Sequence, residues 1–145
     1  MSNKETTDRL LLRELVDLVA VLGDRKDFKA QVQLFTEHAV SQTFAGNTPI
    51  LKLKGRGQME KAFASFLQNY DTIYHFNGQQ VVTIEGEHAT GICYCLVTLI
   101  TNDQGNKKGT TIGAVYQDEY VRENERWLIS SRIGNFSWQI EGSFS

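Results

Sequence analysis

His75 is the first residue of this 145-residue sequence to consider for chemistry, because it stands between Tyr74 and Phe76 at the expected start of a long β-strand. An imidazole titrates near neutral pH, so a histidine in an apolar pocket can take a proton from a substrate and return it. A half-buried strand histidine whose nitrogens bind the backbone gives the same pattern. The residues alone leave both interpretations open, a catalytic base and an ordinary core histidine.

Asp24 is the second candidate, and it follows a helical pattern that ends near Gly23. A carboxylate can orient a histidine ring and stabilise its protonated form. However, Asp24 is followed three residues later by Asp27 and then by an apolar helical face, which is typical of a helix N-cap. Taken alone, the residues favour the cap over a catalytic role.

Other residues that could carry chemistry give weaker patterns. Cys93 and Cys95 alternate on a predicted strand, where they face the same way and are expected to be small buried hydrophobes. Gly55-Arg56-Gly57 lacks the spacing of a phosphate-binding loop and predicts the start of a helix. His38 and His88 are expected at the surface. We expect no metal site and no organic cofactor.

The totals indicate one globular domain over residues 1–145, with 41% hydrophobic residues. The net charge of -2 comes from 15 basic and 17 acidic residues without charge blocks, so we expect no nucleic-acid partner. Charged residues interrupt the apolar run between Leu10 and Leu22, so we expect no membrane span and no signal peptide. These features predict a cytoplasmic protein.

The hydrophobic period changes from helical to alternating near the middle of the chain. Strands as long as those of the second half must curl, and a curled sheet with helices on its concave side encloses a cavity. The sequence thus predicts an α+β domain. Helices are expected at residues 7–22, 26–35 and 58–70, short extended pieces at 38–44 and 50–54, and long antiparallel strands at 73–85, 89–101, 110–122 and 126–140.

This order of elements carries several recognisable motifs, which are Gly23-Asp24-Arg25-Lys26-Asp27-Phe28, Tyr74-His75-Phe76, Glu85-Gly86-Glu87-His88-Ala89-Thr90-Gly91, Tyr116-Gln117-Asp118-Glu119-Tyr120 and Trp127-Leu128-Ile129. With them, nearly the whole chain resembles the nuclear transport factor 2-like superfamily, and within it the SnoaL-like group that includes scytalone dehydratase and bile-acid 7α-dehydratase. The resemblance implies a cone-shaped, curved antiparallel sheet covered by three N-terminal and central helices.

The resemblance also implies a site. Asp24 and His75 occupy the places of an aspartate and a histidine that project into the cavity of those dehydratases, and Asn135 matches an asparagine that contacts substrate. A His-Asp pair in an apolar pocket suits proton abstraction next to a carbonyl, which leads to loss of water or to a double-bond shift. The side-chain amide of Asn135 could donate to the enolate oxygen.

Two positions depart from the pattern of these dehydratases, although the enzyme remains the favoured interpretation. The tyrosine of the dehydratases near the aspartate falls here on Gly23 or Val19, and their second acid or histidine falls near Val97 or Leu99. The alternative is therefore a non-catalytic binding module of the same fold. For either function the expected ligand is a small, mainly apolar compound, and for the enzyme it is a cyclic carbonyl compound.

Strand alternation predicts which residues face the cavity. It places Cys93, Cys95, Val97 and Leu99 on one face of their strand, and Trp127, Ile129, Ser131, Ile133 and Asn135 on one face of the last strand. Arg132 would then point outward. Trp138 could close the cavity mouth or pack on a partner subunit, and we expect a homodimer through the outer face of the sheet. The predicted substrate-binding residues are Asn135, Val97, Leu99, Tyr116 and Trp138.

Overall fold

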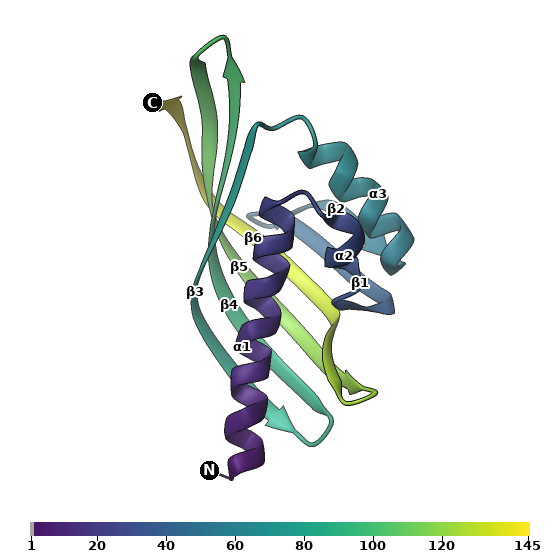
Figure 1. The fold of residues 1–145 in the computed structure, drawn as a ribbon. Helices are drawn as coiled ribbons and strands as arrows, with labels where there is room; N and C mark the ends of the chain where they lie inside the picture. The colour runs from purple at the N-terminus through teal and green to yellow at the C-terminus, as the bar shows by residue number, and fades with distance from the viewer. Residues whose placement is uncertain (1) are drawn as a thin grey trace.

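The computed structural model describes residues 2–145, which form three helices and six strands (Figure 1). The predicted α+β fold class is confirmed. The helices are α1 (Asn3–Asp24), α2 (Phe28–Val32) and α3 (Gly55–Leu67), and the strands are β1 (Phe35–Ala45), β2 (Thr48–Lys54), β3 (Thr72–Glu85), β4 (His88–Asp103), β5 (Asn106–Glu123) and β6 (Arg126–Phe144).

The strands form one mixed sheet in the order β2-β1-β6-β5-β4-β3. Neighbouring strands are antiparallel except β1 and β6, which run parallel. Strands of this length twist and curl strongly. Figure 1 shows α1 running along the long strands while α2 and α3 lie near β1 and β2, so the curved sheet and the helices surround a common interior.

Two bulges in β6 decide which of its side chains point inward. Glu119 pairs with Ser131 and Tyr120 with Ile129, which leaves Ser130 as an extra residue, and a second shift follows between Gly113 and Ala114 of β5. Each extra residue exchanges the two faces of the strand. The predicted single alternation along the last strand is therefore wrong beyond Ser130.

Side-chain caps set the starts of the first two helices. Ser2 caps α1 by accepting a hydrogen bond from the backbone N–H of Glu5 at 3.0 Å, so this helix begins at Asn3 and not at residue 7 as predicted. Asp27 caps α2 by accepting from the N–H of Ala30 at 3.2 Å. The segment beginning at Gly55 starts α3, as predicted.

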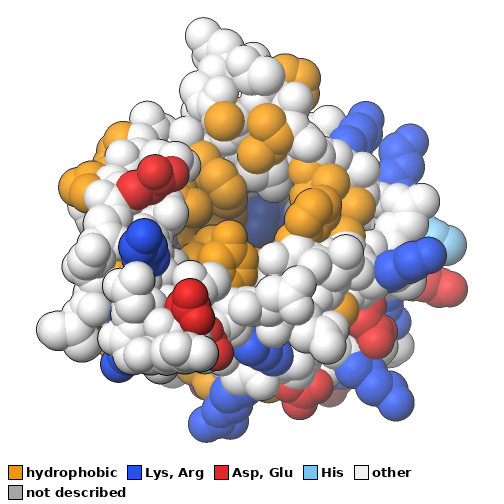
Figure 2. All heavy atoms as spheres, turned by 90° about the horizontal axis from the view of Figure 1, so that it is seen from above, with side chains coloured by type: hydrophobic (Ala, Val, Ile, Leu, Met, Phe, Trp, Pro, Cys, Tyr) orange, Lys and Arg blue, Asp and Glu red, His pale blue; other side chains and the backbone are white. Residues whose placement is uncertain are grey.

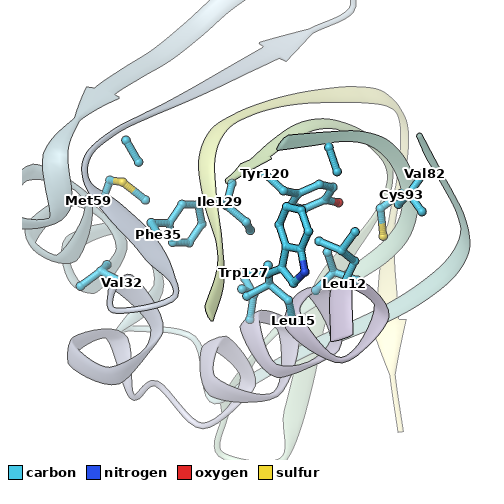
Figure 3. Packing of buried hydrophobic residues seen from close by; sticks show 14 of the residues in the cluster. Leu12, Leu15, Val32, Phe35, Met59, Val82, Cys93, Tyr120, Trp127 and Ile129 are labelled. Atoms are coloured by element: carbon cyan, nitrogen blue, oxygen red, sulfur yellow. The ribbon is translucent and has the colours of Figure 1, made fainter. Parts of the chain in front are cut away.

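The closed end of the interior is filled by hydrophobic side chains from α1 and the sheet. Figure 3 shows Trp127 and Tyr120 packed near Leu12 and Leu15 of α1. Burying a large apolar side chain stabilises a fold by about 1.5–3 kcal/mol. This cluster therefore anchors α1 on the long strands. None of the helices formed by residues 2–145 is long and apolar enough to cross a membrane.

Candidate active site

A cavity of about 390 Å³ lies between the helices and the concave face of the sheet. Figure 2 shows its opening, which is surrounded by hydrophobic side chains and has a basic surface at its floor. The wall is mostly apolar, with a few polar side chains, as is usual for small-molecule sites. The polar lining residues used below are His75, Arg132 and Tyr116.

The end of α1 places Asp24 beside His75 of β3. The Asp24 Oδ1 atom lies 2.7 Å from His75 Nδ1 and also accepts a hydrogen bond from the His75 backbone N–H at 2.9 Å. The side chains of His75 and Asp24 are 17% and 25% exposed. The predicted contact between these two residues is confirmed, whereas the interpretation of Asp24 as a helix cap is wrong because Asp27 has that role.

The contact with the carboxylate determines which nitrogen of His75 is available for chemistry. An ionised carboxylate only accepts hydrogen bonds, so Nδ1 carries the hydrogen and Nε2 keeps its lone pair. His75 lines the cavity, and the contact with Asp24 holds its ring there in a fixed orientation. If Nε2 takes a proton, Asp24 stabilises the resulting imidazolium.

The aromatic neighbours of His75 in the sequence do not form the pocket around it. Tyr74 and Phe76 lie on the opposite, outer face of β3 and are 56% and 61% exposed. The aromatic part of the cavity wall instead comes from other elements, and includes Phe63, Phe66, Tyr70, Tyr116 and Phe136.

Arg132 lies inside the cavity, so the outward position predicted for it is wrong. It lines the cavity because the bulge at Ser130 turns it inward, whereas strand alternation predicted an outward side chain. Its Nε and Nη2 atoms donate to the two carboxylate oxygens of Asp118 at 2.8 and 2.9 Å, and Asp118 has a side-chain exposure of 0%. The guanidinium carbon lies 4.1 Å from the centre of the Tyr116 ring.

This arrangement keeps a positive charge inside an apolar cavity. Burial alone would lower the pKa of Arg132, but the Asp118 carboxylate outweighs burial and raises it above its ordinary value. Tyr120 also donates its hydroxyl to Asp118 Oδ2 at 2.8 Å. Nη1 of Arg132 has no hydrogen-bond partner among residues 2–145 and is a donor for a ligand oxygen.

The same bulges explain why two predicted substrate-binding residues lie outside the cavity. Asn135 is exposed, and its neighbours Gly134 and Phe136 line the cavity in its place. Trp138 follows the second bulge, is 49% exposed and lies over Gly113 on the outer face of the sheet. Asn135 therefore cannot donate to an enolate oxygen in this cavity, and Trp138 does not close its mouth.

The predicted cavity face of β4 is confirmed. Cys95, Val97 and Leu99 line the cavity, as does Tyr116 of β5, and Val97 is the direct neighbour of His75 across the strand pair. Burial raises the pKa of the Cys95 thiol to about 12, so this side chain stays protonated and unreactive near neutral pH. The β4 wall thus supplies apolar surface and no acid or base that acts near neutral pH.

Comparison with solved structures shows which known proteins share this fold. An NTF2-like protein with a cystatin-like fold from Novosphingobium aromaticivorans has a TM-score of 0.76 and 22% identity, covering 92% of this chain and 84% of that one. A proposed scytalone dehydratase from the same organism has a TM-score of 0.84 and 13% identity, covering 100% and 94%. A hexachlorocyclohexane dehydrochlorinase (LinA, type 2) has a TM-score of 0.78 and 15% identity, covering 97% and 91%.

At these identities the structural likeness defines the fold. The sequence goes further, because residues 4–133 match the SnoaL-like domain, and the chain belongs to that family. A search of curated protein sequences finds no significant match. The resemblance inferred from the sequence motifs is thereby confirmed for the superfamily and its SnoaL-like group.

Proposed function

We propose that the protein is a cofactor-independent lyase or isomerase that removes a proton from the carbon next to a carbonyl group of a small, mainly apolar cyclic compound. The observation that carries the proposal is the 2.7 Å contact between Asp24 and Nδ1 of His75 in the wall of an apolar cavity. Two of the structural neighbours, the proposed scytalone dehydratase and the dehydrochlorinase, are named for elimination reactions, which supports this reaction class.

In the proposed reaction Nε2 of His75 takes the proton as the carbon–hydrogen bond breaks. The electron pair moves toward the carbonyl oxygen, and Nη1 of Arg132 donates a hydrogen bond to the enolate that develops. Because the Asp118 carboxylate already balances the Arg132 charge, the site suits a neutral carbonyl compound better than a substrate that is a full anion before reaction.

The second half of the reaction returns the proton. In a dehydration the enolate re-forms the carbonyl, a carbon–carbon double bond forms, the bond to a hydroxyl oxygen breaks, and that oxygen takes the proton from Nε2 and leaves as water. In an isomerisation the proton returns to another carbon. With one titrating group serving both steps, the proton and the hydroxyl leave from the same face of the substrate.

The alternative is a binding module that keeps the cavity but performs no chemistry. The apolar side chains of Val97 and Leu99 beside His75 favour this alternative, because no second acid or base stands there. The two functions differ in one measurable property, since only the enzyme breaks a carbon–hydrogen bond of the bound compound.

Proton abstraction can be tested before the natural substrate is known. Cyclic ketones dissolved in deuterium oxide exchange their α-hydrogens slowly, and the exchange can be followed by proton NMR. We expect the protein to accelerate exchange of at least one such ketone, and we expect His75→Ala to lower the accelerated rate by about 100-fold or more. His88→Ala is the matched control, because His88 is exposed. Ketones that bind without any accelerated exchange would support the binding module.

We also propose that the outer face of the sheet mediates homodimerisation. Exposed apolar side chains gather there on neighbouring strands, and Phe76 pairs with Leu96, which in turn lies beside Gly113 and Trp138. The side chains of Phe76, Leu96 and Trp138 are between 44% and 61% exposed. An exposed apolar patch that spans several strands is typical of an association surface.

A further inference from the structure

The cavity opens to solvent beside two large apolar side chains, one on β2 and one on α3. Ile50 and Phe66 both line the cavity, and they are 53% and 61% exposed. All the other lining residues of the described chain, residues 2–145, are buried or half-buried. Ile50 and Phe66 therefore lie at the mouth of the cavity, where a ligand can reach them without any rearrangement of the wall.

The positive charge of the cavity lies at the opposite depth. The side chain of Arg132 is 11% exposed and that of its partner Asp118 is 0% exposed. Figure 2 shows the same order, with hydrophobic side chains around the opening and a basic surface deep inside. A ligand whose carbonyl oxygen accepts from Nη1 of Arg132 therefore has its far end directed toward the mouth.

The size of the cavity favours a ligand larger than a single ring. A six-membered cyclic ketone has seven non-hydrogen atoms and occupies roughly 200 Å³, if each atom takes the share of about 30 Å³ that a molecule has in liquid water. The cavity holds about 390 Å³, so such a ring leaves close to half of it unfilled. Further carbon atoms of the ligand would fill the space toward the mouth and gain contacts with the apolar wall.

We propose that the cavity selects cyclic carbonyl compounds with an alkyl chain on the side of the ring away from the carbonyl group, and that Ile50 and Phe66 bind the end of this chain. Leu51 of β2 and Leu67 of α3 also line the cavity and extend the apolar wall. A short polar substituent would leave the two mouth residues against water and gain nothing from them. The inference rests on the proposed function for the carbonyl part of the ligand.

Two pairs of ketones test the inference. The probes are 4-methyl- and 4-pentylcyclohexanone, whose chains point away from the carbonyl group, and 2-methyl- and 2-pentylcyclohexanone, whose chains lie beside it. Dissociation constants are measured by NMR titration of the full chain. We expect 4-pentylcyclohexanone to bind about tenfold or more tightly than its methyl partner, because each fully buried CH₂ group is worth about fourfold in affinity. In the 2-series the gain should stay below about threefold, although the two pentyl isomers are similarly hydrophobic.

Variants at the mouth assign the gain to its two apolar side chains. Ile50→Ser and Phe66→Ser should each lower the affinity ratio of 4-pentyl- to 4-methylcyclohexanone by about threefold or more, and should leave the affinity for the methyl compound unchanged because its chain is too short to reach the mouth. The matched controls are Val81→Ser on β3 and Leu10→Ser on α1, which change exposed apolar side chains outside the cavity lining. Neither control should alter the ratio.

A 4-pentyl to 4-methyl ratio near one in the unaltered protein would overturn the inference, as would the failure of both compounds to bind. Equal gains in the 2-series and the 4-series would contradict the orientation with the carbonyl group at Arg132, and a ratio that survives both serine substitutions would contradict the role of the mouth. The titration measures binding alone and can be repeated with His75→Ala. A loss of proton abstraction would therefore leave the chain preference intact, and the two proposals fail separately.

Discussion

The carboxylate of Asp24 lies 2.7 Å from Nδ1 of His75 and also accepts the backbone N–H of the same residue at 2.9 Å, although the two are 51 positions apart in the chain. One oxygen thus fixes both the strand and the ring against the end of α1. The orientation of the proposed base therefore depends on the docking of this helix.

Asp24→Asn should slow α-proton exchange of cyclic ketones by about 10- to 100-fold without abolishing ligand binding. The amide can donate to Nδ1, which would place the ring hydrogen on Nε2, and it carries no charge to stabilise the imidazolium. The measurement compares exchange rates at saturating ketone. Asp27→Asn is the matched control, because Asn also caps helices well and Asp27 caps α2. Equal rates for Asp24→Asn and the unaltered protein would remove Asp24 from the mechanism.

Breaking the buried pair between Asp118 and Arg132 should destabilise the fold strongly. Asp118→Ala leaves a guanidinium without its carboxylate in a mostly apolar wall, and we expect the free energy of unfolding to fall by about 3–5 kcal/mol. The double variant Asp118→Ala/Arg132→Met should lose less than the two single variants added together, because it leaves neither charge unpaired. Chemical unfolding followed by circular dichroism gives all three values. Additive losses would mean that the two side chains are not coupled.

The ion pair between Asp8 and Arg122 should make stability fall in acid. Arg122 Nη1 and Nη2 donate to the two Asp8 oxygens at 2.6 and 3.0 Å, and these hydrogen bonds hold the pKa of Asp8 below its ordinary value of 3.8. The native carboxylate therefore resists protonation more than the unfolded one does. Its contribution is fully present above pH 3.8 and is lost as pH falls below this value through the lowered pKa of the folded state.

Asp8→Asn isolates this contribution. At pH 7 the variant should be less stable by about 2 kcal/mol, which is typical of hydrogen bonds to a charged group. Toward pH 3 and below, the difference between variant and unaltered protein should shrink, because the unaltered carboxyl becomes protonated as well. Urea unfolding at a series of pH values measures the difference. A constant difference across the acid range would contradict the assignment to Asp8.

The parts of this fold that the sequence predicted are those set by local patterns. Alternating apolar residues between turn signals located β3 to β6 within a few residues of their ends, and the turn at Glu85-Gly86-Glu87 is one of those signals. The cavity face of β4 followed from alternation because that strand pairs with β5 without any shift in register. Val97 and Leu99 were therefore placed correctly.

The parts that the sequence did not predict depend on contacts between distant segments. A bulge such as the one at Ser130 is fixed by pairing across two strands, and it reverses the side chains between it and the next bulge. Arg132 therefore points inward and Asn135 outward, the opposite of what unbroken alternation predicts. Alternation predicts the inward position of a residue only where the register is unbroken. The apolar mouth at Ile50 and Phe66 depends on the packing of α3 beside β2, for which the sequence has no local signal.

The outer face of the sheet should hold two copies of the chain together. Tyr94 and Leu96 of β4 are 47% and 44% exposed and lie among the other apolar side chains of that face. We expect sedimentation velocity to show a dimer at micromolar concentration and Tyr94→Lys/Leu96→Lys to give a monomer, because burying two added charges between the sheets is unfavourable. Leu10→Lys, on the exposed side of α1 and 67% exposed in the present structure, is the matched control and should remain a dimer. A monomeric unaltered protein at high concentration would exclude this surface as a homodimer interface and leave the patch, with Trp138 at its edge, to another partner.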